Sequence, residues 1–264
     1  MTTASDIRYR HIVCEVEPPL ATLTMNRPER RNALSLEHME ELTACLQSLS
    51  EDARVATIIL RGNGPAFCSG HDLGEMIDRE QPFYEQLFSA CTVLMETIQS
   101  IPQPVIAQVH GMATAAGCQL VATCDLAIAS EAAQFATPGV RIGLFCSTPM
   151  VALSRNVGRK KALEMLLTGE SLNAEEALAA GLVNRVVPAE ELDAATRALA
   201  AHIASASPYV VGIGKQAFYR QIDLPVSQAY DHTKEVMTNN SLAADAQEGM
   251  GAFLDKRQPQ WCGR

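Results

Sequence analysis

Two glycine-rich segments of this sequence have residue types and spacing that suit a catalytic or ligand-binding site. Residues 64–73 read Gly-Pro-Ala-Phe-Cys-Ser-Gly-His-Asp-Leu, and residues 109–120 read Val-His-Gly-Met-Ala-Thr-Ala-Ala-Gly-Cys-Gln-Leu. Each follows an apolar run and leads toward a helical stretch, where small residues allow the backbone to approach a ligand closely. The free N–H groups at the start of a helix favour negative charge. Two such segments, if they converge, would form an oxyanion hole.

Other ligand-binding motifs with glycine are absent from the sequence. Taken singly, a glycine- and alanine-rich turn between a strand and a helix occurs in most α/β proteins. Neither segment matches the G-x-G-x-x-G pattern of dinucleotide sites, and the chain has no Walker A run. It also lacks a G-x-S-x-G nucleophile elbow.

Several side chains near these segments have alternative roles. The His71 ring has a pKa suited to acid–base work, but it can also point away while only its N–H faces a ligand. Asp72 suits a helix-starting cap, and His110 suits a structural role at a strand end. Asp78 and Glu80 fit a solvated surface. Three further side chains are possible nucleophiles with no adjacent base evident: Cys118, Cys146 and Ser147.

Length and charge restrict the kind of protein. The chain has 264 residues, is 47% hydrophobic and has a formal net charge of −9, which favours one domain, or one with a C-terminal extension. An acidic chain lacks the excess of basic residues that attracts nucleic acid or anionic lipid, so we predict neither partner. Phosphate contacts would need a local cluster, for which Arg27, Arg30 and Arg31 are candidates.

The sequence predicts a cytoplasmic protein with reduced thiols and no metal. Residues 1–10 lack the apolar core and cleavage site of a signal peptide, and no apolar run could span a bilayer. The eight Cys lie in apolar contexts without zinc-like spacing, so we read them as packed thiols.

Strand and helix patterns alternate through residue 130, after which the pattern is almost wholly helical. This order predicts an α/β layer fold followed by a helical region. Predicted strands cover residues 11–17, 20–26, 55–60, 105–109, 126–129 and 183–187. Predicted helices cover residues 35–50, 83–100, 117–123, 159–167, 174–180, 189–205, 208–219 and 242–254.

Taken together, the landmarks resemble the crotonase (enoyl-CoA hydratase/isomerase) superfamily from about residue 10 to residue 257. The matching segments are residues 26–28, 32–34, 66–73, 111–125, 135–138, 143–144, 167–170, 177–183 and 253–257. The resemblance implies a crotonase fold, with a ββα spiral core over residues 1–200 and a C-terminal helical region over residues 201–264. It also implies a homo-oligomer, either a trimer or a dimer of trimers.

The resemblance assigns a site for an acyl-CoA thioester. In this family two backbone N–H groups hold the thioester oxygen, and the matching positions are His71 and Ala116. No separate cofactor is implied, because coenzyme A is part of the substrate. The family's CoA-binding positions match the following residues: Glu29, Arg30, Arg31, His71, Asp72, Leu73, Gly74, Ala116, Gly139, Phe253 and Lys256.

Two departures affect the expected chemistry. Gln119 and Gly139 occupy the positions of the two glutamates with which hydratases add water, and Gln119 could hold a water but exchange no proton. A single general acid–base group is worth ~10²–10⁴-fold in rate, so hydration should be severely impaired. Residues 113–119 with residues 144–149 resemble the enoyl-CoA hydratase domain-containing protein 3 subgroup.

Three hypotheses follow. The first is a CoA-thioester enzyme with nonstandard acid–base chemistry, including isomerase or thioesterase variants. The second is a non-catalytic acyl-CoA-binding pseudoenzyme that keeps the oxyanion hole. The third, a serine hydrolase or peptidase on the same fold, lacks a convincing Ser/His/Asp arrangement in this chain.

Overall fold

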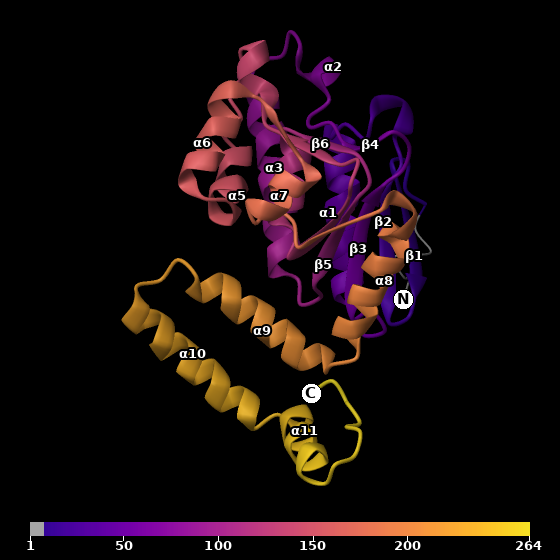
Figure 1. Cartoon of the computed structure of the whole chain (residues 1–264), viewed down its shortest axis with the longest axis vertical. Coiled ribbons are helices and arrows are strands. Elements are labelled where there is room, and N and C mark those ends of the chain that lie inside the picture. Colours follow the sequence, from indigo (N-terminus) through magenta and orange to yellow (C-terminus); the bar gives the residue numbers. More distant parts are fainter. Residues whose placement is uncertain (1–7) are drawn as a thin grey trace.

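The computed structural model describes residues 8–264. The predicted lack of a signal peptide concerns residues 1–10 and therefore lies mostly outside the described residues. Within residues 8–264 the strands form two sheets, and Figure 1 shows their arrangement with the helices. The first sheet has the order β1 (Ile12–Glu17), β2 (Leu20–Met25), β3 (Thr57–Gly62), β5 (Val105–Val109), β7 (Leu126–Ser130) and β10 (Arg185–Val187). All its pairs are parallel except the β1–β2 hairpin.

The second sheet is built from short strands that the sequence patterns did not predict. Its order is β4 (Ala66–Cys68), β6 (Met112–Thr114), β8 (Gln134–Ala136) and β9 (Ser171–Asn173). The first three are parallel, and β9 is antiparallel to β8. The chain passes from β3 to β4, from β5 to β6 and from β7 to β8, and each pair leads into helix. This repeat is the ββα spiral that the resemblance to the crotonase superfamily implies.

Two of the four core helices begin at a residue whose side chain caps them. The four are α1 (Leu36–Ser50), α2 (Leu73–Met76), α3 (Gln81–Ser100) and α4 (Ala116–Thr123). Ser35 caps α1 by accepting a hydrogen bond from the His38 N–H at 3.2 Å. Asp72 caps α2 in the same way, with its Oδ1 accepting from the Gly74 N–H at 3.1 Å. The predicted capping role of Asp72 is therefore confirmed.

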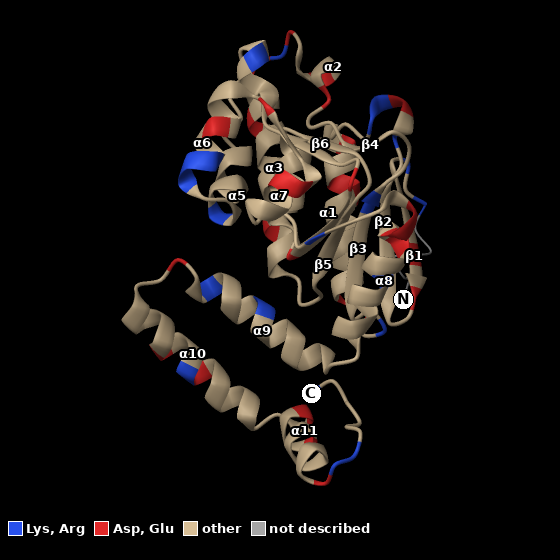
Figure 2. Cartoon of the chain, in the orientation of Figure 1, with Lys and Arg blue, Asp and Glu red and all other residues tan. Residues whose placement is uncertain are grey.

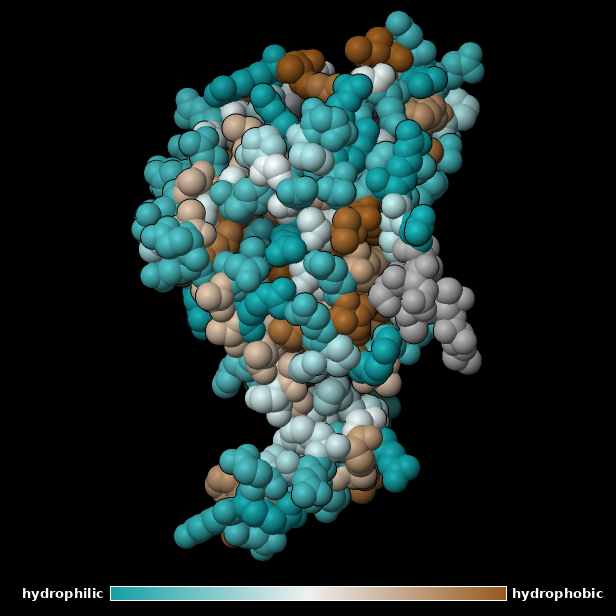
Figure 3. Space-filling model, turned by 90° about the vertical axis from the view of Figure 1, so that its right-hand side faces the viewer, coloured by the Kyte–Doolittle hydropathy of each residue, from teal (hydrophilic) through white to brown (hydrophobic). Residues whose placement is uncertain are grey.

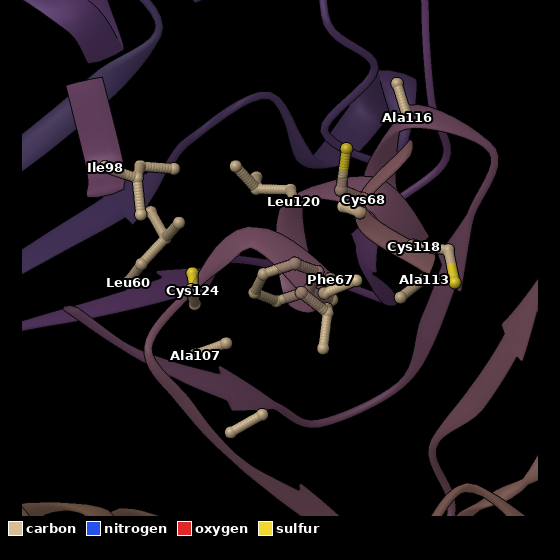
Figure 4. Packing of buried hydrophobic residues seen from close by; sticks show 14 of the residues in the cluster. Leu60, Phe67, Cys68, Ile98, Ala107, Ala113, Ala116, Cys118, Leu120 and Cys124 are labelled. Carbon is tan, nitrogen blue, oxygen red and sulfur yellow. The ribbon is translucent and has the colours of Figure 1, made fainter. Parts of the chain in front are cut away.

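The core lies between the sheets and helices α1, α3 and α4. Phe67 of β4 and Phe135 of β8 are among its largest fully buried side chains. Figure 4 shows Phe67 among small and aliphatic side chains, including Leu60 and Leu120. Burying such a side chain stabilises the fold by roughly 1.5–3 kcal/mol. This packing fixes β4 and α4, the two elements that carry the glycine-rich segments.

The C-terminal half is mostly helical, as predicted. It contains η3 (Pro138–Ile142), α5 (Pro149–Asn156), α6 (Arg159–Thr168), α7 (Ala174–Ala179), η4 (Ala189–Glu191), α8 (Leu192–Ala204), α9 (Pro208–Gln221), α10 (Val226–Ser241) and α11 (Ala244–Leu254). Helix α8 covers the first sheet, where Ala200 packs with Leu20, Ile59 and Ile106. Residue 200 thus lies within a helix of the core.

Helices α9 to α11 form an arm that projects from the core (Figure 1). The arm is anchored by a buried ion pair, in which Lys215 Nζ lies 2.8 Å from Asp125 Oδ2. Tyr219 also donates its hydroxyl to Asp125 Oδ1 at 2.8 Å. Most residues of the arm are neither acidic nor basic (Figure 2), and its exposed apolar side chains include Phe218, Ile222, Val226, Tyr230, Met237, Leu242, Phe253 and Leu254. The oligomeric state remains a prediction, which this apolar surface favours.

Candidate active site

The two glycine-rich segments converge in the structure. Thr114 donates its hydroxyl to the Ser69 carbonyl at 3.1 Å, which ties β6 to the end of β4. Gly70 has a φ of +92°, and a Cβ there would lie 2.8 Å from Ala115 Cβ and 3.3 Å from the Ala116 nitrogen. Gly117 contacts the first segment so closely that a Cβ would lie 2.1 Å from the Cys68 carbonyl oxygen. Both glycines are therefore required by backbone contact between the segments.

The two predicted oxyanion donors are free to bind a ligand. Within residues 8–264, neither the His71 N–H nor the Ala116 N–H donates a hydrogen bond. The neighbouring bonds explain this for His71, because Leu34 pairs with Gly70 and Asp72 on either side of it. Ala116 is the first residue of α4, where N–H groups have no partner in the helix. Both residues line one cavity.

Ala115 holds an unusual backbone conformation immediately before this donor. Its φ is 51° and its ψ is −118°, a region that L-residues other than glycine rarely adopt. Such strain costs about 1–3 kcal/mol and persists where the surrounding structure enforces it. Its own N–H donates to the Ala136 carbonyl at 2.8 Å, which fixes the turn. The strained turn sets the direction of the Ala116 N–H.

The cavity has a volume of about 480 Å³ and is mostly apolar. Its wall contains four residues that the sequence predicted: His71, Leu73, Ala116 and Gly139. Sequence reasoning missed most of the others, because they come from α3, η3 and the segment before α5. Those others include Phe88, Arg141, Ile142, Leu144, Phe145 and Thr148, whereas Cys146 and Ser147, which the sequence offered as possible nucleophiles, also line the cavity. Leu73 in this wall is 48% exposed, and Figure 3 shows apolar atoms at the top of the molecule, the end at which α2 lies in Figure 1.

The His71 ring is neutral and has no partner. Burial lowers the pKa of the imidazole to about 4, against a smaller opposing effect of the Leu34 backbone. Neither ring nitrogen has a hydrogen-bond partner or access to solvent. Phe88 packs edge-on against the ring, with the ring centroids 5.5 Å apart. The ring therefore forms part of the cavity wall beside the His71 N–H, and both of its nitrogens are buried.

Gln119 lies inside α4 and does not line the cavity. Its side chain is buried, and its Oε1 lies 3.9 Å from the Cys91 sulfur, which donates to it. The carboxamide is thus directed into the packing between α3 and α4.

Gly139 lines the cavity, but its missing side chain leaves no empty space. A Cβ there would lie 2.0 Å from the Leu144 carbonyl oxygen and 2.8 Å from Cys146 Sγ. The Leu144 N–H also donates to the Gly139 carbonyl at 2.9 Å. The segment after η3 therefore closes over the position from which a catalytic glutamate would project. Among residues 8–264, no Asp or Glu lines this cavity.

The predicted phosphate cluster needs one correction. Arg27 is not available, because its guanidinium lies 3.0 Å from Asp72 Oδ2 and donates to the Ala33 carbonyl at 2.6 Å. It joins the first landmark to the cap of α2 and is largely buried. Glu29, Arg30 and Arg31 are exposed on the short η2 turn (Pro28–Arg30) and beside it, outside the cavity wall.

The remaining predicted ligand residues lie away from this cavity. Gly74 belongs to the exposed start of α2. Phe253 is 82% exposed on α11, and Lys256 follows that helix, so both lie on the projecting arm. One chain does not bring these two residues to its own cavity. His110 has the structural role predicted for it, with Nε2 2.8 Å from the Gly64 carbonyl oxygen.

The spiral core and the two unpartnered backbone N–H groups are the features that the resemblance to the crotonase superfamily implies. A family model described as "Enoyl-CoA hydratase/isomerase" matches residues 15–264, and the chain belongs to this family. The mouse protein named "Enoyl-CoA hydratase domain-containing protein 3, mitochondrial" is 46% identical over 243 residues, which are 92% of this chain and 81% of the mouse protein. The resemblance to that subgroup is confirmed.

Solved structures agree with the fold. The crystal structure of human enoyl Coenzyme A hydratase domain-containing protein 3 superposes with a TM-score of 0.93 at 45% identity, covering 96% of this chain and 100% of that one. A Mycobacterium smegmatis crystal structure described as an enoyl-CoA hydratase has a TM-score of 0.93 at 48% identity, covering 96% and 99%.

Two observations bear on the cellular compartment. Between residues 8 and 264, no helix is both long and apolar enough to cross a membrane. The vertebrate relatives are named mitochondrial, so the cytoplasmic location of this chain remains a prediction.

Proposed function

We propose that this protein binds an acyl-CoA thioester and polarises its carbonyl between the N–H groups of His71 and Ala116. The observation that carries the proposal is the convergence of two unpartnered backbone donors at one apolar cavity. Donors fixed in a site that excludes water stabilise a developing oxyanion strongly, because no reorganisation is needed. The acyl chain would occupy the apolar wall, and exposed Arg30 and Arg31 would contact the phosphates of CoA.

The same cavity does not support ordinary hydration. Water addition needs a group that takes and gives protons at useful pKa, and no Asp or Glu among residues 8–264 lines the cavity. Gln119 is turned into the helix packing, and the His71 nitrogens are covered. We therefore infer binding and carbonyl polarisation, with hydration of enoyl-CoA absent or far below hydratase rates.

Calorimetry with a matched ligand pair tests the proposal. Butyryl-CoA carries the thioester carbonyl, whereas S-butyl-CoA is a thioether without it. We expect butyryl-CoA to bind more tightly by about 1–3 kcal/mol, because each of two hydrogen bonds to a neutral carbonyl contributes about 0.5–1.5 kcal/mol. Equal affinities for the two ligands would exclude the oxyanion hole.

A glycine pair supplies the control on the protein side. Gly70→Ala places a Cβ 2.8 Å from Ala115 Cβ beside the donors, so it should remove the preference for the carbonyl. Gly158→Ala places a Cβ that meets nothing within 4 Å, so it should leave binding unchanged.

The non-catalytic alternative is favoured by the acid-free cavity wall. Loss of the conjugated thioester absorbance of crotonyl-CoA measures hydration directly. No turnover together with tight butyryl-CoA binding would support the binding protein. Turnover that His71→Ala abolishes would instead support an enzyme that uses the imidazole.

A further inference from the structure

The cavity wall carries a cation and no acid. Within the described part of the chain, Arg141 is the one Lys, Arg, Asp or Glu that lines it. The chain as a whole has a formal charge of −9, so a cationic cavity runs against the general charge of the protein. The N–H groups at the start of α4 add to the positive potential.

Arg141 is held in place by the end of a neighbouring helix. Its Nε donates to the Thr168 carbonyl, the last residue of α6, at 3.1 Å. Gly169 makes room for this contact, since a Cβ there would lie 3.1 Å from Nε and 3.2 Å from Cγ of Arg141. The two terminal NH₂ groups have no partner among residues 8–264. The side chain is thus fixed at one nitrogen and free at the two that can bind an anion.

We propose that the cavity selects CoA thioesters whose acyl group itself carries a carboxylate, and that Arg141 recognises this carboxylate. The inference rests on the proposed function, because it concerns the same cavity. A guanidinium matches a carboxylate through two parallel hydrogen bonds, and this geometry gives specificity as well as affinity. The oxyanion donors hold the thioester end, and Arg141 holds the acyl end.

The loss of acidic groups is consistent with this ligand. In relatives with a glutamate at the position of Gly139, a carboxylate would lie next to the acyl carboxylate and repel it. Gln119 is neutral and buried, and at Gly139 the backbone of Leu144 closes the space. Gly139 and Arg141 lie two residues apart in the same short turn, so the wall presents the cation without a competing anion.

A guanidinium binds phosphates as well as carboxylates, so the experiment must distinguish the phosphates of CoA from the acyl carboxylate as the anion that Arg141 binds. Calorimetry compares ligands with equal carbon number: glutaryl-CoA against pentanoyl-CoA, and succinyl-CoA against butyryl-CoA. Each pair shares the phosphates and differs in the acyl carboxylate. The variants are Arg141→Gln and, as a control with the same loss of charge, Arg159→Gln. Arg159 is exposed at the start of α6.

We expect the wild-type protein to bind one or both dicarboxylate ligands about tenfold more tightly than the neutral partner. Arg141→Gln should remove this preference and leave the neutral ligand unchanged, whereas Arg159→Gln should keep it. The preference should also fall with added salt in the unaltered protein, a test that needs no variant. Equal affinities within both ligand pairs would overturn the proposal. It would also be overturned if Arg141→Gln weakened the binding of charged and neutral ligands equally, because Arg141 would then bind the phosphates. If none of the ligands binds, the proposed function itself fails.

Discussion

Restoring the second glutamate should fail to restore hydration, because the space for it is closed. In Gly139→Glu the new Cβ would lie 2.0 Å from the Leu144 carbonyl oxygen, far inside van der Waals contact. The obstructing atom is backbone, so the segment joining η3 to α5 must move. Overpacking of this kind costs about 1–3 kcal/mol or more. For a chain of this size, about 3 kcal/mol corresponds to roughly 6–12 °C in Tm.

The assay combines thermal unfolding with the loss of crotonyl-CoA absorbance. Gln119→Glu, Gly139→Glu and the double variant are each measured, and Gly214→Glu serves as control because a Cβ there meets nothing within 4 Å. We expect a lowered Tm in both variants that carry Gly139→Glu and also in Gln119→Glu, whose carboxylate would be buried between α3 and α4 without a cationic partner, and no hydratase activity in any of them. An unchanged Tm for Gly139→Glu, together with rapid hydration by the double variant, would refute this account of the site.

Three further predictions concern stability. Lys215→Met leaves the buried Asp125 carboxylate without its ion pair, so it should cost about 3–5 kcal/mol and lower Tm by ~10 °C, whereas Lys234→Met in an exposed pair should change Tm little. The pKa of His71 is about 4 in the folded protein and 6.5 in the unfolded chain, so the unfolded chain binds the proton more readily. The free energy of unfolding should therefore fall as the pH drops from 6.5 to 4. Denaturant titrations should show a smaller fall in His71→Phe. Although desolvation opposes it, hydrogen bonds from Ser207 and from the Cys262 and Gly263 N–H groups lower the pKa of Asp245 to about 2. The stability that the Asp245 carboxylate contributes to the fold should therefore be complete above pH 3.8 and be lost as the pH falls to 2. Asp245→Asn should reduce the attachment of the C-terminal segment at pH 7 and speed proteolysis of residues 255–264.

The sequence predicted the elements that have a strong apolar period. Helices α1 and α3 bury one face each, and the first-sheet strands are apolar runs with clear ends. The second sheet was missed because its strands have three residues each, too few to show a period of two. Helix α10 was missed for another reason: it buries no residue within the chain, so it has no apolar stripe against the core.

The site could be predicted where it consists of local backbone and not where it depends on distant contacts. The resemblance of the two glycine-rich segments to the family indicated the N–H groups of His71 and Ala116, and in the structure both are without an acceptor and line one cavity; their oxyanion role stays a prediction. The closure over Gly139 involves a backbone carbonyl of Leu144, which leaves no side-chain signal. Arg27 was misassigned to a phosphate cluster because its partner Asp72 lies 45 residues away.

Infrared difference spectroscopy tests the central claim most directly. Butyryl-CoA labelled with ¹³C at the thioester carbonyl is bound to the protein, and its carbonyl stretching frequency is compared with that of the free ligand. Two hydrogen bonds from the His71 and Ala116 N–H groups should lower the frequency, and Gly70→Ala should reverse the shift in the fraction that still binds. A bound thioester whose carbonyl frequency equals that in solution would contradict the account.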